Sequence, residues 1–412
     1  MKKLIIVALV LMSTMAFATN GYFSHGVGTK HKAMAGAGVA LPTSPLSATL
    51  NPAANSFLST RFELNFALFS PSREFTVTGN PSMQPGTFPL TPGTVESDSK
   101  YFVVPAFGLN YKVDENTALS FQLYGNGGMN TDYDNNIFYG GKPVGVNLSQ
   151  LFLGFTASRK LTDNHSLGVT SIFAYQMFEA KGLAAFASMS SDPENLTNNE
   201  TDGAKGYGVR FGYLGKFFDM ICLGASYQSK IWMTEFDKYR GLFAEQGGFD
   251  IPSNWTIGLA VKAMDNLHMA LDFTQYRYSE IASISNPFAN LMQGGMLGLG
   301  NGAGFGWEDM NVIKFGANYS LNETMDVQVG YSYGQQPIPE KEVMFNILAP
   351  GVVEQHITLG VSKKLNDKKG INVAFMFAPQ GSVKGANPME VPGQQEIELK
   401  MMQWDLEVGF TF

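Results

Sequence analysis

Apolar and polar or small side chains alternate with a period of two residues along much of the chain. The pattern is clearest over residues 404–412, where the apolar positions are Trp404, Leu406, Val408, Phe410 and Phe412. It recurs at 267–274, 325–333 and 371–377. Alternation of this kind is typical of strands with one apolar face, whereas an amphipathic helix repeats every three or four residues. The sequence therefore predicts a protein built of strands.

The connections between the predicted strands are alternately short and long. Short turns containing Asp, Asn or Lys are predicted at 113–116, 161–164, 218–219, 264–266, 321–323 and 366–369. Seven longer loops are predicted at 70–100, 126–147, 181–205, 232–252, 279–309, 334–354 and 379–400. Thirteen connections join fourteen strands. The first strand is predicted at 61–69. Short turns at one end and long loops at the other characterise outer-membrane barrels. We predict an all-β fold, a 14-stranded antiparallel transmembrane β-barrel.

The first sixty residues do not alternate, and they divide into two parts. Lys2 and Lys3, an apolar stretch at 4–12 and the small-residue site Ala16-Phe17-Ala18 form an export signal, which we expect to be removed after residue 18. Residues 19–60 are rich in Gly and small side chains and poor in charge. We predict that they form a hatch that plugs the lumen of a barrel spanning 61–412. A solvated tail is the alternative, although such tails are usually rich in charge.

Composition excludes several other classes of protein. Charged residues make up 15% of the chain, and Gly (45), Phe (32) and Tyr (16) are abundant, which favours strands and turns over long helices. The single cysteine, Cys222, excludes a disulfide scaffold. The net charge is -7 and no basic stretch could follow a row of phosphates, so no nucleic acid partner is expected. We find no nucleotide-binding loop and no histidine spacing suited to a metal, and we expect no cofactor.

Several motifs resemble the FadL-type family of outer-membrane transport proteins for fatty acids and other hydrophobic compounds. The motifs are Thr19-Asn20-Gly21-Tyr22-Phe23-Ser24-His25-Gly26, Met34-Ala35-Gly36-Ala37-Gly38, Asn51-Pro52-Ala53, Gly304-Phe305-Gly306-Trp307-Glu308-Asp309 and Phe345-Asn346-Ile347-Leu348-Ala349-Pro350-Gly351. The resemblance implies a location in the Gram-negative outer membrane. It also implies a hatch containing Gly36, Gly38, Asn51, Pro52 and Ala53. The expected partners are a hydrophobic substrate, outer-membrane lipid and lipopolysaccharide, and the barrel assembly machinery during biogenesis.

The resemblance further implies that substrate leaves sideways, through a gap at a kink in the third strand. That strand is predicted near 116–124 and runs into Gly125, Gly127 and Gly128. Glycines weaken a strand ladder and permit a bend, so we expect the opening there. The alternative is that these glycines only begin an outer loop.

Apolar residues in two outer loops are candidates for the substrate site. They are Leu183, Phe186 and Met189 in one loop and Leu242, Phe243 and Phe249 in the other. With Phe23 they are expected to line the path, although they could instead pack the loops together. The family also implies a basic residue for a carboxylate, and only Lys181 is near a suitable place. Residues 300–306 contain no basic residue, which keeps a neutral substrate open.

We therefore expect a passive channel for hydrophobic small molecules, with long-chain fatty acids as the leading substrate class. Monoaromatic or alkane hydrocarbons are the alternative. The candidate from another class is an outer-membrane lipid hydrolase, but no serine and histidine are brought together by sequence position. An enzyme is not expected. A general porin is disfavoured, because an open pore has no use for a plug of some forty residues.

Overall fold

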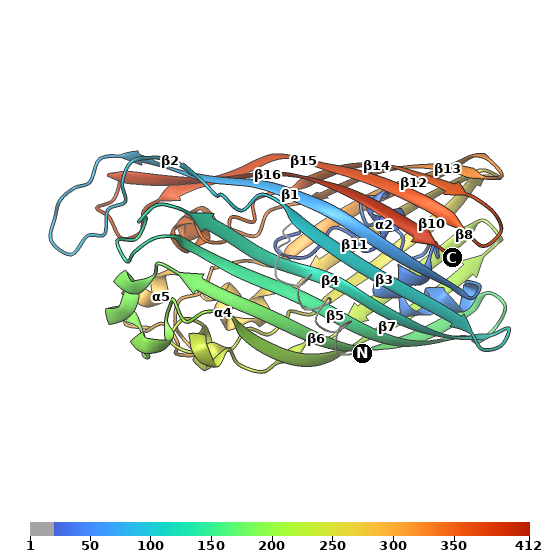
Figure 1. The fold of residues 1–412 in the computed structure, drawn as a ribbon, viewed down its shortest axis with the longest axis horizontal. Helices are drawn as coiled ribbons and strands as arrows, with labels where there is room; N and C mark the ends of the chain where they lie inside the picture. The colour runs from blue at the N-terminus through green and yellow to red at the C-terminus, as the bar shows by residue number, and fades with distance from the viewer. Residues whose placement is uncertain (1–19) are drawn as a thin grey trace.

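The computed structural model describes residues 20–412, so the export signal predicted at 1–18 lies outside its range. Fourteen of its strands form one antiparallel barrel (Figure 1). They are β1 (Arg61–Gly79), β3 (Phe102–Lys112), β4 (Thr117–Tyr133), β5 (Val144–Lys160), β6 (His165–Lys181), β7 (Asp202–Phe217), β8 (Ile221–Gln228), β10 (Asn254–Met264), β11 (Leu267–Tyr276), β12 (Met310–Asn322), β13 (Met325–Gly334), β14 (Gln355–Lys364), β15 (Gly370–Ala386) and β16 (Gln395–Thr411). The short strands β2 (Gly93–Glu96) and β9 (Trp232–Met233) pair with β1 and β7 outside this ring.

The barrel closes by pairing its last strand with its first. β16 pairs with β1 from Glu63–Thr411 to Gly79–Gln395. At the chain end, the backbones of Phe412 and Phe62 exchange two hydrogen bonds of 2.9 and 3.1 Å. Closure leaves no free sheet edge between these strands, as a membrane-spanning sheet requires. The predicted strand number is confirmed.

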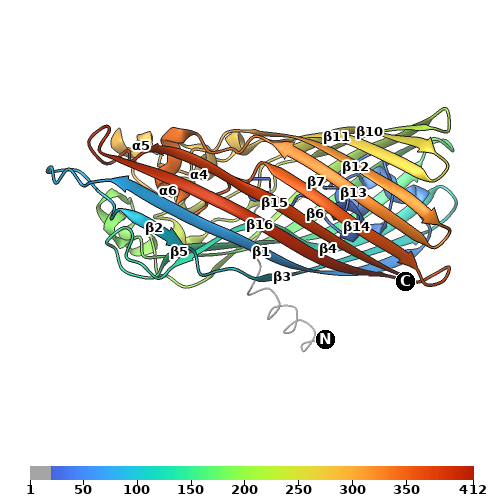
Figure 2. The same cartoon turned by 90° about the horizontal axis from the view of Figure 1, so that it is seen from above.

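The six short turns lie where the sequence predicts them, but several strands are longer than predicted. β1 was expected to end at residue 69 and continues to Gly79, and β15 and β16 extend with it beyond the other strands (Figure 2). Along this extension Phe75 and Val77 are buried while Glu74 and Thr76 face outward. The outward positions of this extension are polar, so the apolar alternation ends although the strand continues, and the prediction of a loop from residue 70 is wrong.

The strands alternate between a lipid-facing and a lumen-facing side. In β14, for example, Ile357, Leu359 and Val361 are exposed, whereas the intervening Thr358 and Ser362 are buried. An apolar outer face suits contact with acyl chains, since lipid offers polar groups no hydrogen bonds. Within residues 20–412, no helix combines the length and apolar composition needed to cross a membrane.

Residues 20–60, here called the hatch segment, fold inside the barrel near the end with the short turns (Figure 1). The segment contains helix α2 (Thr29–Lys32) and the 3₁₀ helices η2 (Pro45–Thr49) and η3 (Pro52–Phe57), and it is largely buried. The long loops at the other end carry further short helices: α3 (Ala244–Gly247), α4 (Ala282–Ser285), α5 (Ala289–Met292), α6 (Val343–Asn346), η4 (Ala184–Met189), η5 (Pro193–Asn195), η6 (Asp237–Tyr239), η7 (Tyr278–Glu280) and η8 (Glu340–Glu342).

Candidate functional site

Buried charge holds α2 of the hatch segment to the barrel wall. The Lys32 ammonium lies 2.9 Å from a carboxylate oxygen of Asp405 and 2.8 Å from one of Glu407, both on β16. The Thr29 hydroxyl lies 2.7 Å from the Asn65 amide oxygen and 2.9 Å from a Glu407 carboxylate oxygen. Burial alone would lower the pKa of Lys32, but the two carboxylates raise it above its ordinary value. This network ties α2 to β1 and β16.

The residues predicted to belong to the hatch also lie at contacts with the wall. The Asn51 side chain donates to the carbonyl oxygens of Val39 (2.7 Å) and Tyr213 (2.9 Å) and accepts from the Ala53 amide (3.0 Å). Pro52 begins η3, where its missing N–H is no loss. The Gly38 amide donates to the Asp272 carboxylate at 2.8 Å. Gly36 has φ 79°, and a Cβ there would collide with the backbone of His25.

The first residues of the hatch segment pair with β4 as if they were a short strand. Phe23 forms an antiparallel bridge with Gly127. The Ser24 amide donates to the Asn126 carbonyl oxygen and the Gly128 amide donates to the Tyr22 carbonyl oxygen, each at 3.0 Å. A Cβ at Gly127 would collide with the Tyr22 carbonyl group. The glycine therefore admits the hatch backbone against the wall.

The ladder between β3 and β4 is incomplete, and residues 22–24 pair with β4 where β3 does not. The two strands pair from Lys112–Ala118 up to Ala106–Tyr124 and no further. The next residue of β3 is Pro105, which has no N–H to donate, and the next residue of β4 is Gly125. β4 itself continues to Tyr133, paired with β5 across a register shift between Gly125 and Gly127. The three glycines thus lie within a strand and beside an interrupted seam.

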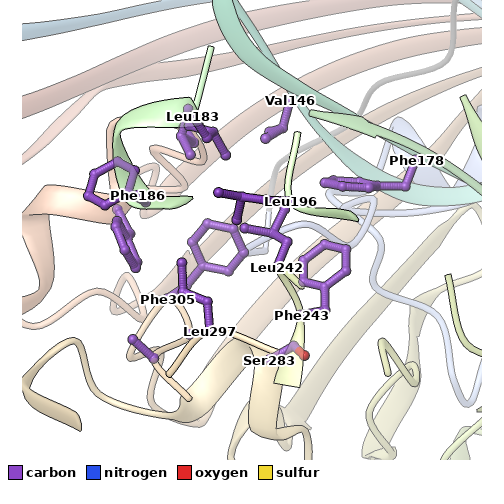
Figure 3. A pocket seen from close by; sticks show the side chains of 14 residues that line it. Val146, Phe178, Leu183, Phe186, Leu196, Leu242, Phe243, Ser283, Leu297 and Phe305 are labelled. Atoms are coloured by element: carbon purple, nitrogen blue, oxygen red, sulfur yellow. The ribbon is translucent and has the colours of Figure 1, made fainter. Parts of the chain in front are cut away.

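An apolar pocket lies among the long loops, and we call it the outer pocket (Figure 3). The space between its side chains, including the part that is open to solvent, is about 500 Å³. Its lining is almost wholly apolar, with Ser283 the one side chain bearing a hydroxyl: Val146, Phe178, Leu183, Phe186, Leu196, Leu242, Phe243, Ser283, Leu297, Ala303, Gly304, Phe305, Phe345 and Leu348. A concave apolar lining of this kind suits a hydrophobic ligand.

The structure brings most of the candidate loop residues to this pocket. Leu183, Phe186 and Phe243 line it, and Phe249 packs behind Phe243 with a ring separation of 4.7 Å. Lys181 does not line it. The Lys181 ammonium lies 3.2 Å from the Glu179 carboxylate, and its side chain is 45% exposed. The lining also includes loop residues that were not expected there from the sequence, such as Leu196 and Leu297.

Aromatic rings of the hatch segment close the inner side of this region. Tyr22 stacks on Phe23 at 4.9 Å and lies 6.4 Å from Phe249 and 6.0 Å from Trp307 between ring centroids. Phe23 in turn stacks on Tyr276 at 4.7 Å. We call Tyr22 and Phe23 the aromatic step, because they lie between the outer pocket and the next cavity.

The next cavity, which we call the inner cavity, has a lining of both polar and apolar residues, and its space, including the part that is open to solvent, is about 600 Å³. Phe23, Tyr124, Arg210 and Lys314 are among its lining residues. The Lys314 ammonium donates to the His25 carbonyl oxygen at 3.3 Å. The buried Arg210 donates to Gln228, and its Nη1 has no hydrogen-bond partner among residues 20–412. Asp272 on β11 pairs in register with Lys314 and offsets part of its charge, so Arg210 is the buried cation that most favours an anionic ligand.

Sequence reasoning missed Arg210 and Lys314. Both are buried positions on strands whose neighbouring residues face lipid, such as Phe211 and Ile313. The available signal was a basic residue at an inward position of a predicted membrane strand, because such residues are costly unless they serve a function.

A buried serine and histidine do meet in the structure, although their positions in the sequence gave no sign of it. The Ser332 hydroxyl lies 2.9 Å from His356 Nδ1. Both residues are fully buried on the lumen side, and the His25 ring of the hatch segment stacks on His356 at 5.6 Å. The hatch segment thus covers this pair on the lumen side. Among residues 20–412, no three metal-binding side chains cluster.

Comparisons with known proteins agree with this geometry. The family model described as "Outer membrane protein transport protein (OMPP1/FadL/TodX)" matches residues 7–401. The chain resembles the solved toluene transporter TodX of P. putida, with 18% identity, a TM-score of 0.67 and coverage of 94% of this chain and 98% of that one. For a FadL homologue of Pseudomonas aeruginosa the values are 17%, 0.71, 95% and 99%. For the toluene transporter TbuX of Ralstonia pickettii they are 16%, 0.64, 94% and 98%. No curated protein sequence matches the chain.

Proposed function

The chain belongs to the outer-membrane transport protein family of FadL and TodX, and from this premise we propose that it is a passive channel for long-chain fatty acids that releases them sideways into the membrane. The coarser activity, transport of hydrophobic compounds across the outer membrane, follows from the family. An apolar solute is poorly soluble in the hydrated layer outside the cell, and shielding it there lowers the barrier without an energy source.

One observation carries the proposal: the outer pocket, the aromatic step and the interrupted β3–β4 seam adjoin one another. Tyr22 contacts Phe249 behind the pocket, while the backbone of Tyr22 bonds to Gly128 at the seam. Movement of this short stretch of chain would therefore act on both places at once. It would connect the pocket to the inner cavity and free the edge of β4 above Tyr124. Residues 20–60 act in this scheme as the hatch.

Arg210 and Lys314 favour a substrate with a carboxylate. Both line the inner cavity behind Phe23. Neither forms an ion pair within residues 20–412, although Asp272 stands opposite Lys314 in the strand register. A carboxylate that reached the cavity would meet two cations in a polar lining, while its apolar tail remained among the rings of the path. A hydrogen bond to a charged group contributes about 1.5 to 3 kcal/mol, on the order of tenfold or more in affinity.

Monoaromatic hydrocarbons are the second candidate, because no charged side chain lines the outer pocket. TodX and TbuX are named toluene transporters, and a neutral ring would need nothing from Arg210 or Lys314. The two candidates differ in their dependence on these two cations.

A double substitution distinguishes the two substrates. Arg210→Gln with Lys314→Gln is expected to lower fatty-acid uptake about tenfold and to leave toluene uptake unchanged. Uptake is measured in cells lacking other channels of this family, and folding is checked by heat-modifiable mobility. Lys181→Ala is the matched control, because Lys181 lies outside both cavities and should leave both uptakes unchanged. Equal loss of both substrates, or undiminished fatty-acid uptake in the folded variant, would contradict the carboxylate role.

A further inference from the structure

The unpaired stretch of the β3–β4 seam has a lower and an upper edge. The ladder between the two strands stops at the pair Ala106–Tyr124, which is the lower edge. The two chain segments meet again toward the long loops, where the Asp98 amide donates to the Asp132 carbonyl oxygen at 2.8 Å. We call this second meeting point the upper edge. The seam is therefore unpaired over a limited length, and what lies at its two edges decides how it opens.

Arg73 of β1 lies at the upper edge, on the inner side of the wall. Its side chain points inward and the residue is 3% exposed. The guanidinium donates to the carbonyl oxygen of Asn130 on β4 and to that of Ser99, which precedes β3. Its central carbon also lies 5.7 Å from the centre of the Phe102 ring. Arg73 thus contacts both sides of the seam where the unpaired stretch ends.

The charge of Arg73 has no acidic partner among residues 20–412. Arg73 takes part in none of the salt bridges of this range, and its Nε has no hydrogen-bond partner there. The two carbonyl groups that accept from it are neutral, so they offset only part of a full charge. Burial of an unpaired cation is costly. A barrel that retains one favours a functional role for it.

A small pocket lies between Arg73 and the aromatic step. Its space, including the part that is open to solvent, is about 220 Å³. It is lined by Arg73, Met129, Asn130, Trp307, Ala349, Pro350, Gly351 and Met401. The Trp307 ring lies 6.0 Å from the Tyr22 ring between centroids. Movement of the aromatic step would therefore open a way from the lumen toward Arg73.

Arg73 also lies at the height where the apolar outer surface of β1 ends. The outward residues Phe66 and Leu68 are apolar and exposed. The outward residues on either side of Arg73, Ser72 and Glu74, are polar, which marks the outer boundary of the apolar band. A fatty acid in a membrane keeps its tail in the hydrocarbon and its carboxylate at such a boundary, because burial of the charge is costly.

We propose that Arg73 receives the carboxylate of a fatty acid as the molecule leaves through the β3–β4 seam. This inference rests on the proposed function and adds a specificity-determining residue at the exit. The carboxylate leaves Arg210 and Lys314 in the inner cavity and pairs with Arg73 before it reaches the membrane surface, while the tail passes into the lipid. A carboxylate bonds to a guanidinium more strongly than a carbonyl group does. It therefore displaces the Asn130 and Ser99 carbonyl groups and frees the upper edge of the seam.

Uptake of two solutes with the same chain tests the role of Arg73. Initial rates are measured for oleate and for oleyl alcohol in cells lacking other channels of this family. Arg73→Gln is expected to lower the oleate rate about tenfold and to leave the rate for the uncharged alcohol unchanged. Arg73→Lys keeps the charge and should retain most of the oleate rate. The control Lys400→Gln removes a cation at nearly the same height on the outer face of β16 and should change neither rate.

Binding to the purified protein separates the exit from the inner cavity. Titration calorimetry with oleate is expected to give the wild-type affinity for Arg73→Gln and a weaker affinity for Arg210→Gln/Lys314→Gln. The folding of all variants is compared by heat-modifiable mobility.

A cross-link in the wild type tests the same contact without any substitution. A fatty acid that carries a diazirine beside its carboxylate is photolysed on the protein, and the labelled peptides are identified by mass spectrometry. Labels are expected at Met129 or Asn130, beside Arg73, as well as around the inner cavity. Labels confined to the inner cavity would contradict the proposal.

The uptake results can overturn the proposal in three ways. Undiminished oleate uptake by folded Arg73→Gln, with uptake lost in Arg210→Gln/Lys314→Gln, would contradict the exit role and leave the proposed function in place. Equal loss of oleate and oleyl alcohol would reduce Arg73 to a structural support of the seam. Oleate uptake that depends on none of the three cations would overturn the fatty-acid function together with this inference.

Discussion

The two ends of the hatch segment are held in the barrel by different forces. From α2 onward the segment is bound by buried polar contacts to the wall, which include Lys32 with Asp405 and Glu407 and the side chain of Asn51 with the Tyr213 carbonyl oxygen. Residues 20–24 are held by ring stacking and by a few backbone hydrogen bonds to β4 and Tyr278.

This difference indicates which part of the hatch segment can move. Breaking a buried ion pair costs several kcal/mol, whereas a backbone hydrogen bond contributes about 0.5 to 1.5 kcal/mol, because water replaces the lost partner. Segments with few such contacts open locally while the rest of the protein stays folded. We infer that residues 20–24 move during transport and that residues 28–58 remain in place.

Loss of the buried ammonium should have the largest effect on stability. Lys32→Met leaves the Asp405 and Glu407 carboxylates buried without a cation, which is expected to destabilise the protein by about 3 to 5 kcal/mol. Urea unfolding in lipid vesicles measures the change. Lys384→Met removes an exposed ion pair with Glu396 and should change stability far less, because water screens such a pair. Equal effects of the two substitutions would contradict the inference that residues 28–58 are held firmly to the barrel wall.

Acid should also lower the stability of the part of the hatch segment that contains α2. Burial lowers the pKa of His31 to about 4, from an ordinary value of 6.5. Between pH 6.5 and 4 the unfolded chain therefore binds the proton more readily, so stability falls as pH falls through this window, by about 3 kcal/mol at most. His31→Gln should make unfolding less dependent on pH there. An unchanged pH profile would show that His31 gains no proton on unfolding.

Weakening the contacts of residues 20–24 should have the smallest effect on global stability. Phe23→Ala removes the stacking on Tyr22 and Tyr276, and we expect residues 20–24 to open without unfolding the barrel. Hydrogen exchange should increase at residues 20–24, while the urea midpoint shifts by less than that of Lys32→Met. A midpoint shift as large as that of Lys32→Met would show that the two ends open together.

The sequence predicted the barrel well because a closed membrane barrel requires a regular pattern of apolar positions and turns. Lipid-facing positions must be apolar, and each turn at the periplasmic end is short, so strand number and turn positions could be counted. The parts of strands that extend above the membrane lack this apolar alternation. At β1 the outward residues Glu74 and Thr76 face water, and the apolar alternation is lost although the strand continues.

The site was only partly predictable, since it depends on contacts between distant residues. Apolar residues in the loops were recognisable, and Leu183, Phe186 and Phe243 do line the outer pocket. The interrupted seam required both Pro105 on one strand and Gly125 on the next, and their proximity follows only from register. Arg210 and Lys314 come together because the barrel closes, which no local pattern records.

If residues 20–24 leave the β3–β4 seam for substrate to pass, as we infer, a disulfide that holds them there should block transport. Ser24 and Asn126 lie opposite each other in the short ladder, where Cα atoms are about 5.5 Å apart, within the range a disulfide can bridge. Ser24→Cys/Asn126→Cys is made in a Cys222→Ser background, with each single cysteine variant as control. We expect uptake of hydrophobic substrate to be lost on oxidation and restored by reductant. Equal uptake by the fully cross-linked and reduced forms would contradict it.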